Sequence, residues 1–234
     1  MKRLGITIDP IVALREWGGT HTPDPLSAIA MMELAGVDSV VYTLPERPSA
    51  LVDRDLRLLK DIIHSHFNLR IGPDAAAVQK AVDARAEMVT FVGFENGRAA
   101  GVRVEAHEQA LAGFVRTLRA AGAVVNILIE PDAHQIKAAT RFGCDYVDFF
   151  VNRYVHADSM TLMEQELENL RAMALAAAKL KLGVSVSGDL DHNHVRSILD
   201  IGEIEEINVG DAILNRALFF GLDQAIRDFA AILK

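Results

Sequence analysis

The stretch VVNILIEPDAHQIKAATRFGCDYVDFFV, residues 124–151, contains a complete strand–helix–strand unit. Its two ends are short runs of Val, Ile, Leu and Phe, which are typical of strands buried on both faces. Between them, a Pro-Asp pair precedes a helical pattern that ends at Phe142-Gly143, and glycine commonly follows the last turn of a helix. The stretch therefore predicts two parallel strands joined by a helix.

The same unit recurs along the whole chain. About eight strands are predicted, each followed by a helical pattern, at residues 4–9, 39–44, 68–72, 88–93, 124–130, 146–151, 183–188 and 206–210. In a chain of 234 residues this alternation predicts one α/β domain over residues 1–234, a single (β/α)8 TIM barrel. A doubly wound open sheet is the alternative, but the GxGxxG and GxxxxGK[ST] phosphate-binding motifs of such sheets are missing.

Composition excludes several classes of protein. The formal charge is −8, which disfavours nonspecific binding to nucleic acid or to an anionic membrane. The one cysteine, Cys144, precedes an apolar run and is predicted to be packed in the core, so no internal disulfide is expected. No apolar run approaches the ~18 residues of a membrane span, and the first one is too short for a secretion signal. We expect a cytoplasmic protein with no nucleic-acid or membrane partner.

In a TIM barrel the chemistry lies at the carboxyl ends of the strands. Here these ends are rich in carboxylates, arginines and amides, namely Thr7, Asp9, Thr43, Glu46, Arg47, Arg70, Glu95, Asn96, Glu130, Asp132, Asp148, Asn152, Arg153, Ser187, Asp189, Asp191, His192, Asn208 and Asp211. None of the seven lysines lies on a predicted strand, so imine chemistry with a carbonyl substrate is not expected.

The last two strand ends, VSVSGDL (184–190) and INVGDAILNRA (207–217), predict a phosphate site. Gly188 and Gly210 let backbone N–H groups approach an anion, and the helix that begins near Asp211 adds its dipole. Both glycines are also explained as ordinary turn formers. In addition, Asp189 and Asp211 repel a phosphate unless an arginine or another cation lies between them.

Four aspartates at the predicted mouth raise the question of a divalent metal, because carboxylate oxygens suit Mg²⁺ and Mn²⁺. They are Asp9, Asp148, Asp189 and Asp211. We favour the simpler interpretation that they cap helices or pair with Arg15, Arg70 and Arg216. The sequence therefore predicts no metal site and no cofactor.

Several longer segments resemble one known family over essentially the whole chain. They are ITIDPIVALREWGGTHTPDP (6–25), YTLPERPSALVDRDLRLLK (42–60), NLRIG (68–72), VNILIEPDAHQIKAA (125–139), GVSVSGDLDHNHV (183–195) and EEINVGDAILNRALFFGLDQAI (205–226). The family is pyridoxine 5′-phosphate synthase, the barrel enzyme of vitamin B6 biosynthesis. The resemblance implies a metal-free acid–base condensation of 1-deoxyxylulose 5-phosphate with 3-amino-2-oxopropyl phosphate, and an octamer of barrels.

The family's framework residues are retained, but most of its proton-transfer residues are replaced. Asp9, Arg15, Glu46, Gly210 and the run Asp53-Arg54-Asp55 match. Residues of other types stand where the family has histidine, namely Pro10, Thr43, Ala50, Gly188 and Asp211. The resemblance aligns Thr7 with an Asn of the family, and Gly18 and Pro45 with arginines. It aligns Arg70 with the catalytic Glu of the third strand and Asp148 with the Glu of the sixth. Asp189 aligns with a Gly. The threonine-rich lid after the fourth strand reads GRAAGVRV (97–104).

From the strand ends and the resemblance together we predict two sets of site residues. The catalytic set is Asp9, Thr43, Glu46, Asp148 and Asp189. The set that binds substrate or phosphate is Thr7, Arg15, Arg70, Ser187, Gly188, Asn208, Gly210 and Asp211.

Three functions stay open on the sequence. The first is a divergent relative of the synthase that binds or converts a small phosphorylated metabolite by another mechanism, because each lost proton-transfer group is typically worth about 10²–10⁴ in rate. The second is an authentic synthase with a rewired site, a condensing transferase. The third is a non-catalytic binding or regulatory barrel. Whether the chain is an enzyme is thus left open, and a homo-oligomer is expected from the resemblance.

Overall fold

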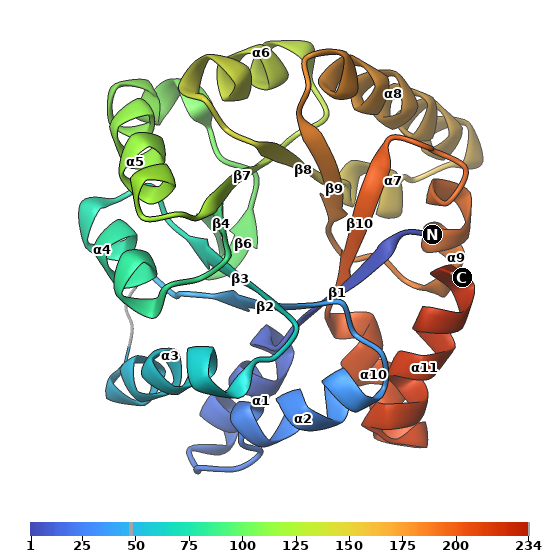
Figure 1. Cartoon of the computed structure of the whole chain (residues 1–234). Coiled ribbons are helices and arrows are strands. Elements are labelled where there is room, and N and C mark those ends of the chain that lie inside the picture. The colour runs from blue at the N-terminus through green and yellow to red at the C-terminus, as the bar shows by residue number, and fades with distance from the viewer. Residues whose placement is uncertain (47–48, 234) are drawn as a thin grey trace.

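The computed structural model describes residues 1–46 and 49–233, so Arg47 lies outside the described residues. Eight parallel strands close into a barrel in the order β1-β10-β9-β8-β7-β4-β3-β2 (Figure 1). Their bounds are β1 Arg3–Thr7, β2 Ser39–Thr43, β3 His66–Ile71, β4 Met88–Phe91, β7 Val124–Ile129, β8 Tyr146–Phe150, β9 Gly183–Ser187 and β10 Ile204–Val209. The barrel closes because β1 pairs with both β2 and β10. The predicted (β/α)8 barrel is confirmed, and the open sheet is wrong.

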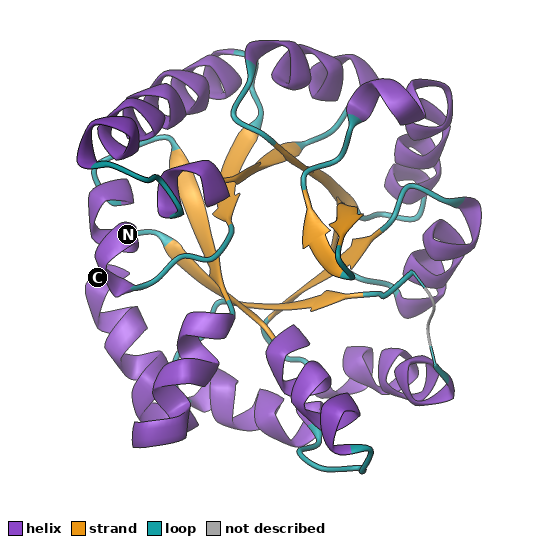
Figure 2. Cartoon of the chain, turned by 180° about the vertical axis from the view of Figure 1, so that it is seen from behind, coloured by secondary structure: helices purple, strands orange, loops and turns teal. Residues whose placement is uncertain are grey.

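The helices form a ring outside the barrel (Figure 2). Their bounds are α1 Asp9–Gly18, α2 Pro25–Leu34, α3 Ala50–Ile62, α4 Ala75–Ala84, α5 Glu108–Ala120, α6 Ala133–Phe142, α7 Asn152–Val155, α8 Met160–Lys179, α9 His192–Ile198, α10 Asp211–Phe220 and α11 Leu222–Leu233, with a 3-10 turn at Val104–His107. Many begin at an Asp or Ser whose side chain accepts a backbone N–H, as Asp132 does for α6. None of the described helices is long and apolar enough to cross a membrane.

The apolar core lies between the strands and the helices, while the inside of the barrel is largely polar. Outward-facing strand residues such as Ile127 and Phe149 are fully buried against the helices. The alternate positions carry buried polar side chains, namely Asn68, Arg70, Thr90, Asn126, Asp148, Ser185, Ser187, Glu206 and Asn208. Contacts across the barrel, such as that from Asn126 Nδ2 to Ser185 Oγ at 3.3 Å, show that these side chains point inward.

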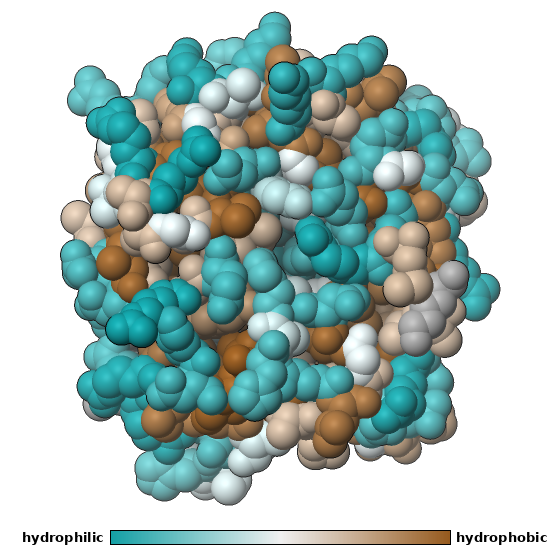
Figure 3. Space-filling model, in the orientation of Figure 1, coloured by the Kyte–Doolittle hydropathy of each residue, from teal (hydrophilic) through white to brown (hydrophobic). Residues whose placement is uncertain are grey.

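Exposed apolar side chains stand among the hydrophilic ones on the outside, as the face in Figure 3 shows. The most exposed aromatic residues are Trp17 at the end of α1 and Phe219 at the end of α10. Cys144 is buried, and this burial raises its pKa to about 12. Its environment fits the packing role predicted for it.

One element is absent from our prediction. The strand expected over 88–93 ends at Phe91, and an antiparallel hairpin follows, with β5 at Gly93–Glu95 and β6 at Arg98–Ala100. Asn96 and Gly97 form its turn, with φ of 51° and 76°. An Asn-Gly pair is a strong hairpin signal because both residues tolerate positive φ. The hairpin extends from the carboxyl end of β4, the end at which a barrel carries its site.

Candidate functional site

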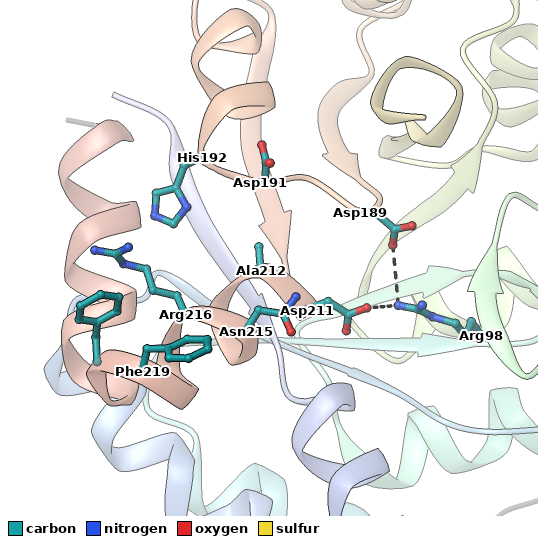
Figure 4. Close-up of a pocket in the computed structure, with 10 residues that line it drawn as sticks. Arg98, Asp189, Asp191, His192, Asp211, Ala212, Asn215, Arg216 and Phe219 are labelled. Atoms are coloured by element: carbon teal, nitrogen blue, oxygen red, sulfur yellow. Dashed lines mark hydrogen bonds and ion pairs between the residues drawn. The ribbon is translucent and has the colours of Figure 1, made fainter. Parts of the chain in front are cut away.

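Arg98, on the hairpin, spans the mouth of the barrel. In the barrel order β4 lies opposite β10, yet the Arg98 guanidinium reaches the residues that follow β9 and β10. Its Nη2 donates to Asp211 Oδ2 and lies 3.7 Å from Asp189 Oδ1 (Figure 4). These carboxylates raise the pKa of Arg98, chiefly through the hydrogen bond to Asp211. An arginine therefore lies between the two carboxylates that would otherwise repel a bound anion.

A cavity of about 490 Å³ opens beside Arg98 (Figure 4). It runs from Asp189 and Asp211 along α10 to Arg216 and Phe219. Its size suits a small metabolite. Among the residues that the structure describes, no group of three or more His, Cys, Asp or Glu side chains is arranged to hold a metal ion.

Asp189 is held from the side of α7. Asn152 Oδ1 accepts the Asp189 N–H at 2.8 Å, and His156 Nε2 lies 2.7 Å from Asp189 Oδ2. Gly188, just before it, has a φ of 148°, and a Cβ there would lie 2.5 Å from Asn152 Oδ1. Glycine is therefore required for the close approach of this loop to α7.

A second group of predicted residues meets where β1, β2 and β10 end. Asp9 Oδ1 accepts the Thr43 N–H at 2.8 Å, and Thr7 Oγ1 accepts the Asp9 N–H at 3.3 Å. A Cβ on Gly210 would lie 2.3 Å from Thr7 Cγ2, so only glycine fits without movement. Gly210 also precedes α10, whose first turn has no side-chain cap. The backbone N–H groups of this turn can therefore bind an anion at the mouth.

Arg70, Asp148 and Ser187 form a buried cluster inside the barrel, below the mouth. Arg70 Nη2 lies 3.1 Å from Asp148 Oδ2 and also donates to Ser187 Oγ, which in turn donates to Asp148 Oδ2. Burial raises the pKa of Asp148, and the Arg70 charge opposes this change. Arg70 thus neutralises a buried carboxylate, and only 6% of its surface is exposed to a ligand.

Asn208 and Glu206 lie deeper on β10 and are both 2% exposed. Neither polar atom of the Asn208 amide has a hydrogen-bond partner among the described residues. Burial raises the pKa of Glu206 to about 7, although Arg3 Nε lies only 3.2 Å from its carboxylate. Burial outweighs the Arg3 charge, because the Arg3 side chain is 46% exposed and solvent screens its charge.

Of the predicted site residues, only Asp189 and Asp211 line the cavity. Arg15 and Glu46 lie outside the groups described above as well. Arg15 is fully buried between α1 and α3, where its Nη1 lies 2.7 Å from Asp55 Oδ2. Its family position suggested a phosphate ligand, but here its charge is matched by a buried carboxylate. Glu46 is exposed beyond the end of β2.

Four residues of the mouth were not in our predicted site, namely Arg98, Glu130, Asn152 and His156. The Asn96-Gly97 turn could have indicated the hairpin that carries Arg98. Glu130 and Asn152 stood among the polar strand ends, but no pattern selected them. His156 follows a short helix, α7, whose position depends on tertiary packing.

Comparison with known proteins supports the sequence resemblance. A family model described as "Pyridoxal phosphate biosynthesis protein PdxJ" matches residues 4–234. The chain is 34% identical to the pyridoxine 5′-phosphate synthase of Geotalea daltonii, over 100% of this chain and 99% of that protein. It is also 34% identical to the Geobacter sulfurreducens protein of that name, with the same coverage.

Solved structures share the barrel at low sequence identity. KGPDC from Streptococcus mutans has a TM-score of 0.67 at 11% identity, covering 99% of this chain and 97% of that one. A 3-hexulose-6-phosphate synthase has a TM-score of 0.61 at 15% identity, covering 99% and 100%. These similarities show the fold alone. The family model and the full-length relatives go further, and the chain belongs to the family of the pyridoxal phosphate biosynthesis protein PdxJ.

Proposed function

We propose that this protein is a divergent pyridoxine 5′-phosphate synthase-like barrel that acts on a small phosphorylated metabolite at its mouth. The observation that carries the proposal is the position of Arg98 between Asp189 and Asp211, beside the uncapped first turn of α10. Arg98 supplies the cation without which two carboxylates would oppose a phosphate dianion.

The phosphate site combines backbone and side-chain donors. The backbone donors are the N–H groups in the uncapped first turn of α10. Gly188 and Gly210 let the loops after β9 and β10 pack closely on Asn152 and Thr7, where a Cβ would collide. Arg98 exchanges part of its contact with Asp211 for the phosphate when the ligand binds. The other residues predicted to bind substrate, Thr7, Arg70, Ser187 and Asn208, do not line this cavity.

The mechanism differs from the one that the family resemblance implies. Of the predicted catalytic set, Asp9 accepts a backbone N–H of Thr43, and Asp148 is paired with Arg70. Asp189 is in contact with His156 and Arg98. These contacts orient the carboxylates. His156 also supplies an imidazole beside Asp189, next to Gly188, where the family has a histidine. Metal and cofactor are not required by this assignment, and homo-oligomerisation stays a prediction.

An authentic synthase is the second candidate, and similarity to proteins of that name over the whole chain favours it. The two candidates are separated by turnover. Purified protein is incubated with 1-deoxyxylulose 5-phosphate and 3-amino-2-oxopropyl phosphate beside an authentic synthase, and product is followed by mass spectrometry. We expect no pyridoxine 5′-phosphate at a comparable rate. Product at a comparable rate would identify an authentic synthase.

Phosphate binding tests the part that both candidates share. Inorganic phosphate is titrated into the protein by calorimetry and by thermal shift, and we expect saturable binding with stabilisation. Absence of any effect up to high millimolar phosphate would refute a phosphate site at the mouth. It would favour a barrel that does not bind phosphorylated ligands. If phosphate binds and the two substrates give no product, other phosphorylated carbonyl compounds are screened next.

A further inference from the structure

The cavity beside Arg98 has two ends of different chemistry (Figure 4). Arg98, Asp189 and Asp211 form a charged end at the barrel mouth. Phe219 and Phe220, in the last turn of α10, line the other end. The proposed phosphate site occupies the charged end and leaves the aromatic end without a role.

One face of α10 forms the wall between these two ends. Asp211, Asn215 and Phe219 follow one another at intervals of four residues, so their side chains lie on the same face of the helix. All three line the cavity, and Figure 4 shows them in this order leading away from Arg98. At about 1.5 Å per residue, the helix from Asp211 to Phe219 spans about 12 Å. Inorganic phosphate fills only a small part of this length.

The Phe219 ring has a free face at the aromatic end. Phe219 is 84% exposed, so its ring offers a large apolar surface that a ligand can cover. Phe220 differs, because the Cζ atom of Arg216 lies 4.6 Å from the centre of its ring. Among the residues that the structure describes, no aromatic ring or cation stacks on Phe219 in this way. Phe219 can therefore stack on a planar group of a bound ligand.

We propose that the ligand of this cavity carries a planar aromatic ring that stacks on Phe219 and is joined to its phosphate by a sugar-sized spacer. A nucleoside 5′-monophosphate has this arrangement, and a cavity of about 490 Å³ has room for it. Asn215 lies between the two ends, where its exposed amide can hydrogen-bond to a hydroxyl of the spacer. This ligand class deepens the proposed function and rests on it, because the phosphate occupies the site at Arg98.

The experiment measures how much a planar ring adds to the binding of a phosphate ester. Adenosine 5′-monophosphate and ribose 5-phosphate are titrated into the wild-type protein by calorimetry at one pH and ionic strength, because the sugar phosphate lacks the base. Stacking of a base on an aromatic side chain corresponds to about 5- to 150-fold in affinity. We expect the nucleotide to bind more tightly than the sugar phosphate by a factor in this range. Equal affinities for the two esters would overturn the proposal.

Variants of one turn of α10 test whether Phe219 supplies this preference. Phe219→Ala should lower the affinity for the nucleotide to that for the sugar phosphate, whereas Phe219→Tyr keeps the ring and should bind as wild type does. Leu218→Ala is the matched control, because Leu218 is 68% exposed in the same turn and does not line the cavity. A Phe219→Ala protein that still prefers the nucleotide would contradict the assignment. So would a Leu218→Ala protein that loses the preference to the same extent.

Two further ligands separate this proposal from the proposed function. Adenosine carries the ring without the phosphate, and inorganic phosphate carries the anion without the ring. If inorganic phosphate binds and the nucleotide binds no more tightly than the sugar phosphate, the ring site is wrong and the phosphate site stands. If adenosine binds only when Phe219 is present and inorganic phosphate does not bind at all, the phosphate site is wrong and the ring site stands.

The exposed Phe219 ring could also be covered by a second copy of the chain. Analytical ultracentrifugation of wild type, Phe219→Ala and Leu218→Ala at the concentration of the titrations tests this alternative. We expect Phe219→Ala to keep the oligomeric state of wild type. An oligomer that dissociates in Phe219→Ala while the preference for the nucleotide is kept would make Phe219 a contact between copies and overturn the proposal.

Discussion

The guanidinium of Arg98 and the carboxylate of Asp211 join opposite sides of the barrel mouth by a charge-assisted hydrogen bond. Arg98 is carried by a hairpin that leaves β4, whereas Asp211 begins α10 after β10. The pair thus connects the hairpin that follows β4 to the first turn of α10. It also brings a positive charge to the position where the predicted phosphate site needs one.

Arg98→Ala should weaken binding of inorganic phosphate by at least about tenfold. The reason is the loss of one charge-assisted contact, worth about 1.5–3 kcal/mol before Asp189 and Asp211 are left uncompensated. Calorimetric titration at fixed ionic strength measures the change. Arg116→Ala, an exposed arginine of α5, is the control and should leave phosphate binding unchanged. Equal affinity of Arg98→Ala and wild type would contradict the role given to Arg98.

Gly188→Ala should destabilise the protein and disturb the loop after β9. Its φ of 148° is strained for alanine, and the new Cβ would lie 2.5 Å from Asn152 Oδ1. We expect a loss of about 1–3 kcal/mol in the free energy of unfolding, measured by urea denaturation. Gly202→Ala meets nothing within 4 Å and should change stability far less. Similar losses of stability for the two variants would show that the loop after β9 can shift to accept a Cβ at residue 188.

Asp148→Ala should cost about 3–5 kcal/mol of stability, because it leaves the Arg70 charge buried without its partner. Replacing both residues, as in Arg70→Met with Asp148→Leu, should recover much of this loss. Urea denaturation of the single and double variants provides the comparison. If the single variant loses less than about 1 kcal/mol, the ion pair does not neutralise a buried charge in solution.

Glu206 should make stability fall as the pH rises from about 4.5 to about 7. Its pKa in the folded protein is about 7 against 4.5 for an unperturbed glutamate, so the folded state binds the proton more tightly. The resulting stabilisation of the folded state is complete below the pKa of the unfolded state, and it is lost as the pH rises through the pKa of the folded state. At about 1.36 kcal/mol per pH unit, the upper limit is about 3 kcal/mol.

Glu206→Gln should remove this dependence, so that the variant matches wild type near pH 4 and exceeds it in stability at pH 8. Thermal or urea unfolding across this pH range tests the prediction. Arg3 keeps a second partner in the variant, because its Nη2 lies 3.6 Å from Glu205 Oε2. Parallel stability curves for variant and wild type would mean that Glu206 ionises normally in the fold.

The strand–helix alternation was sufficient to predict the barrel. Each strand is a short aliphatic run buried on both faces, and such runs separated by helices have few ways to cover both faces of a parallel sheet. Local caps such as Asp132 and Gly143 also act over a few residues, so sequence order alone sets them. The family resemblance rested on the same framework, and the comparisons confirm it.

The site was predicted only in part, because ion pairs are chosen by three-dimensional proximity. Arg15 lies in the last turn of α1 and pairs with Asp55 in the helical layer, whereas Arg70 lies near the end of β3 and pairs with Asp148 inside the barrel. Arg98 contacts Asp211, which is 113 residues away, and no local pattern encodes such a pair. The sequence by itself determined the fold, the family and the polar character of the mouth. Only the tertiary structure decided which charges neutralise one another, because these pairs join residues far apart in the sequence.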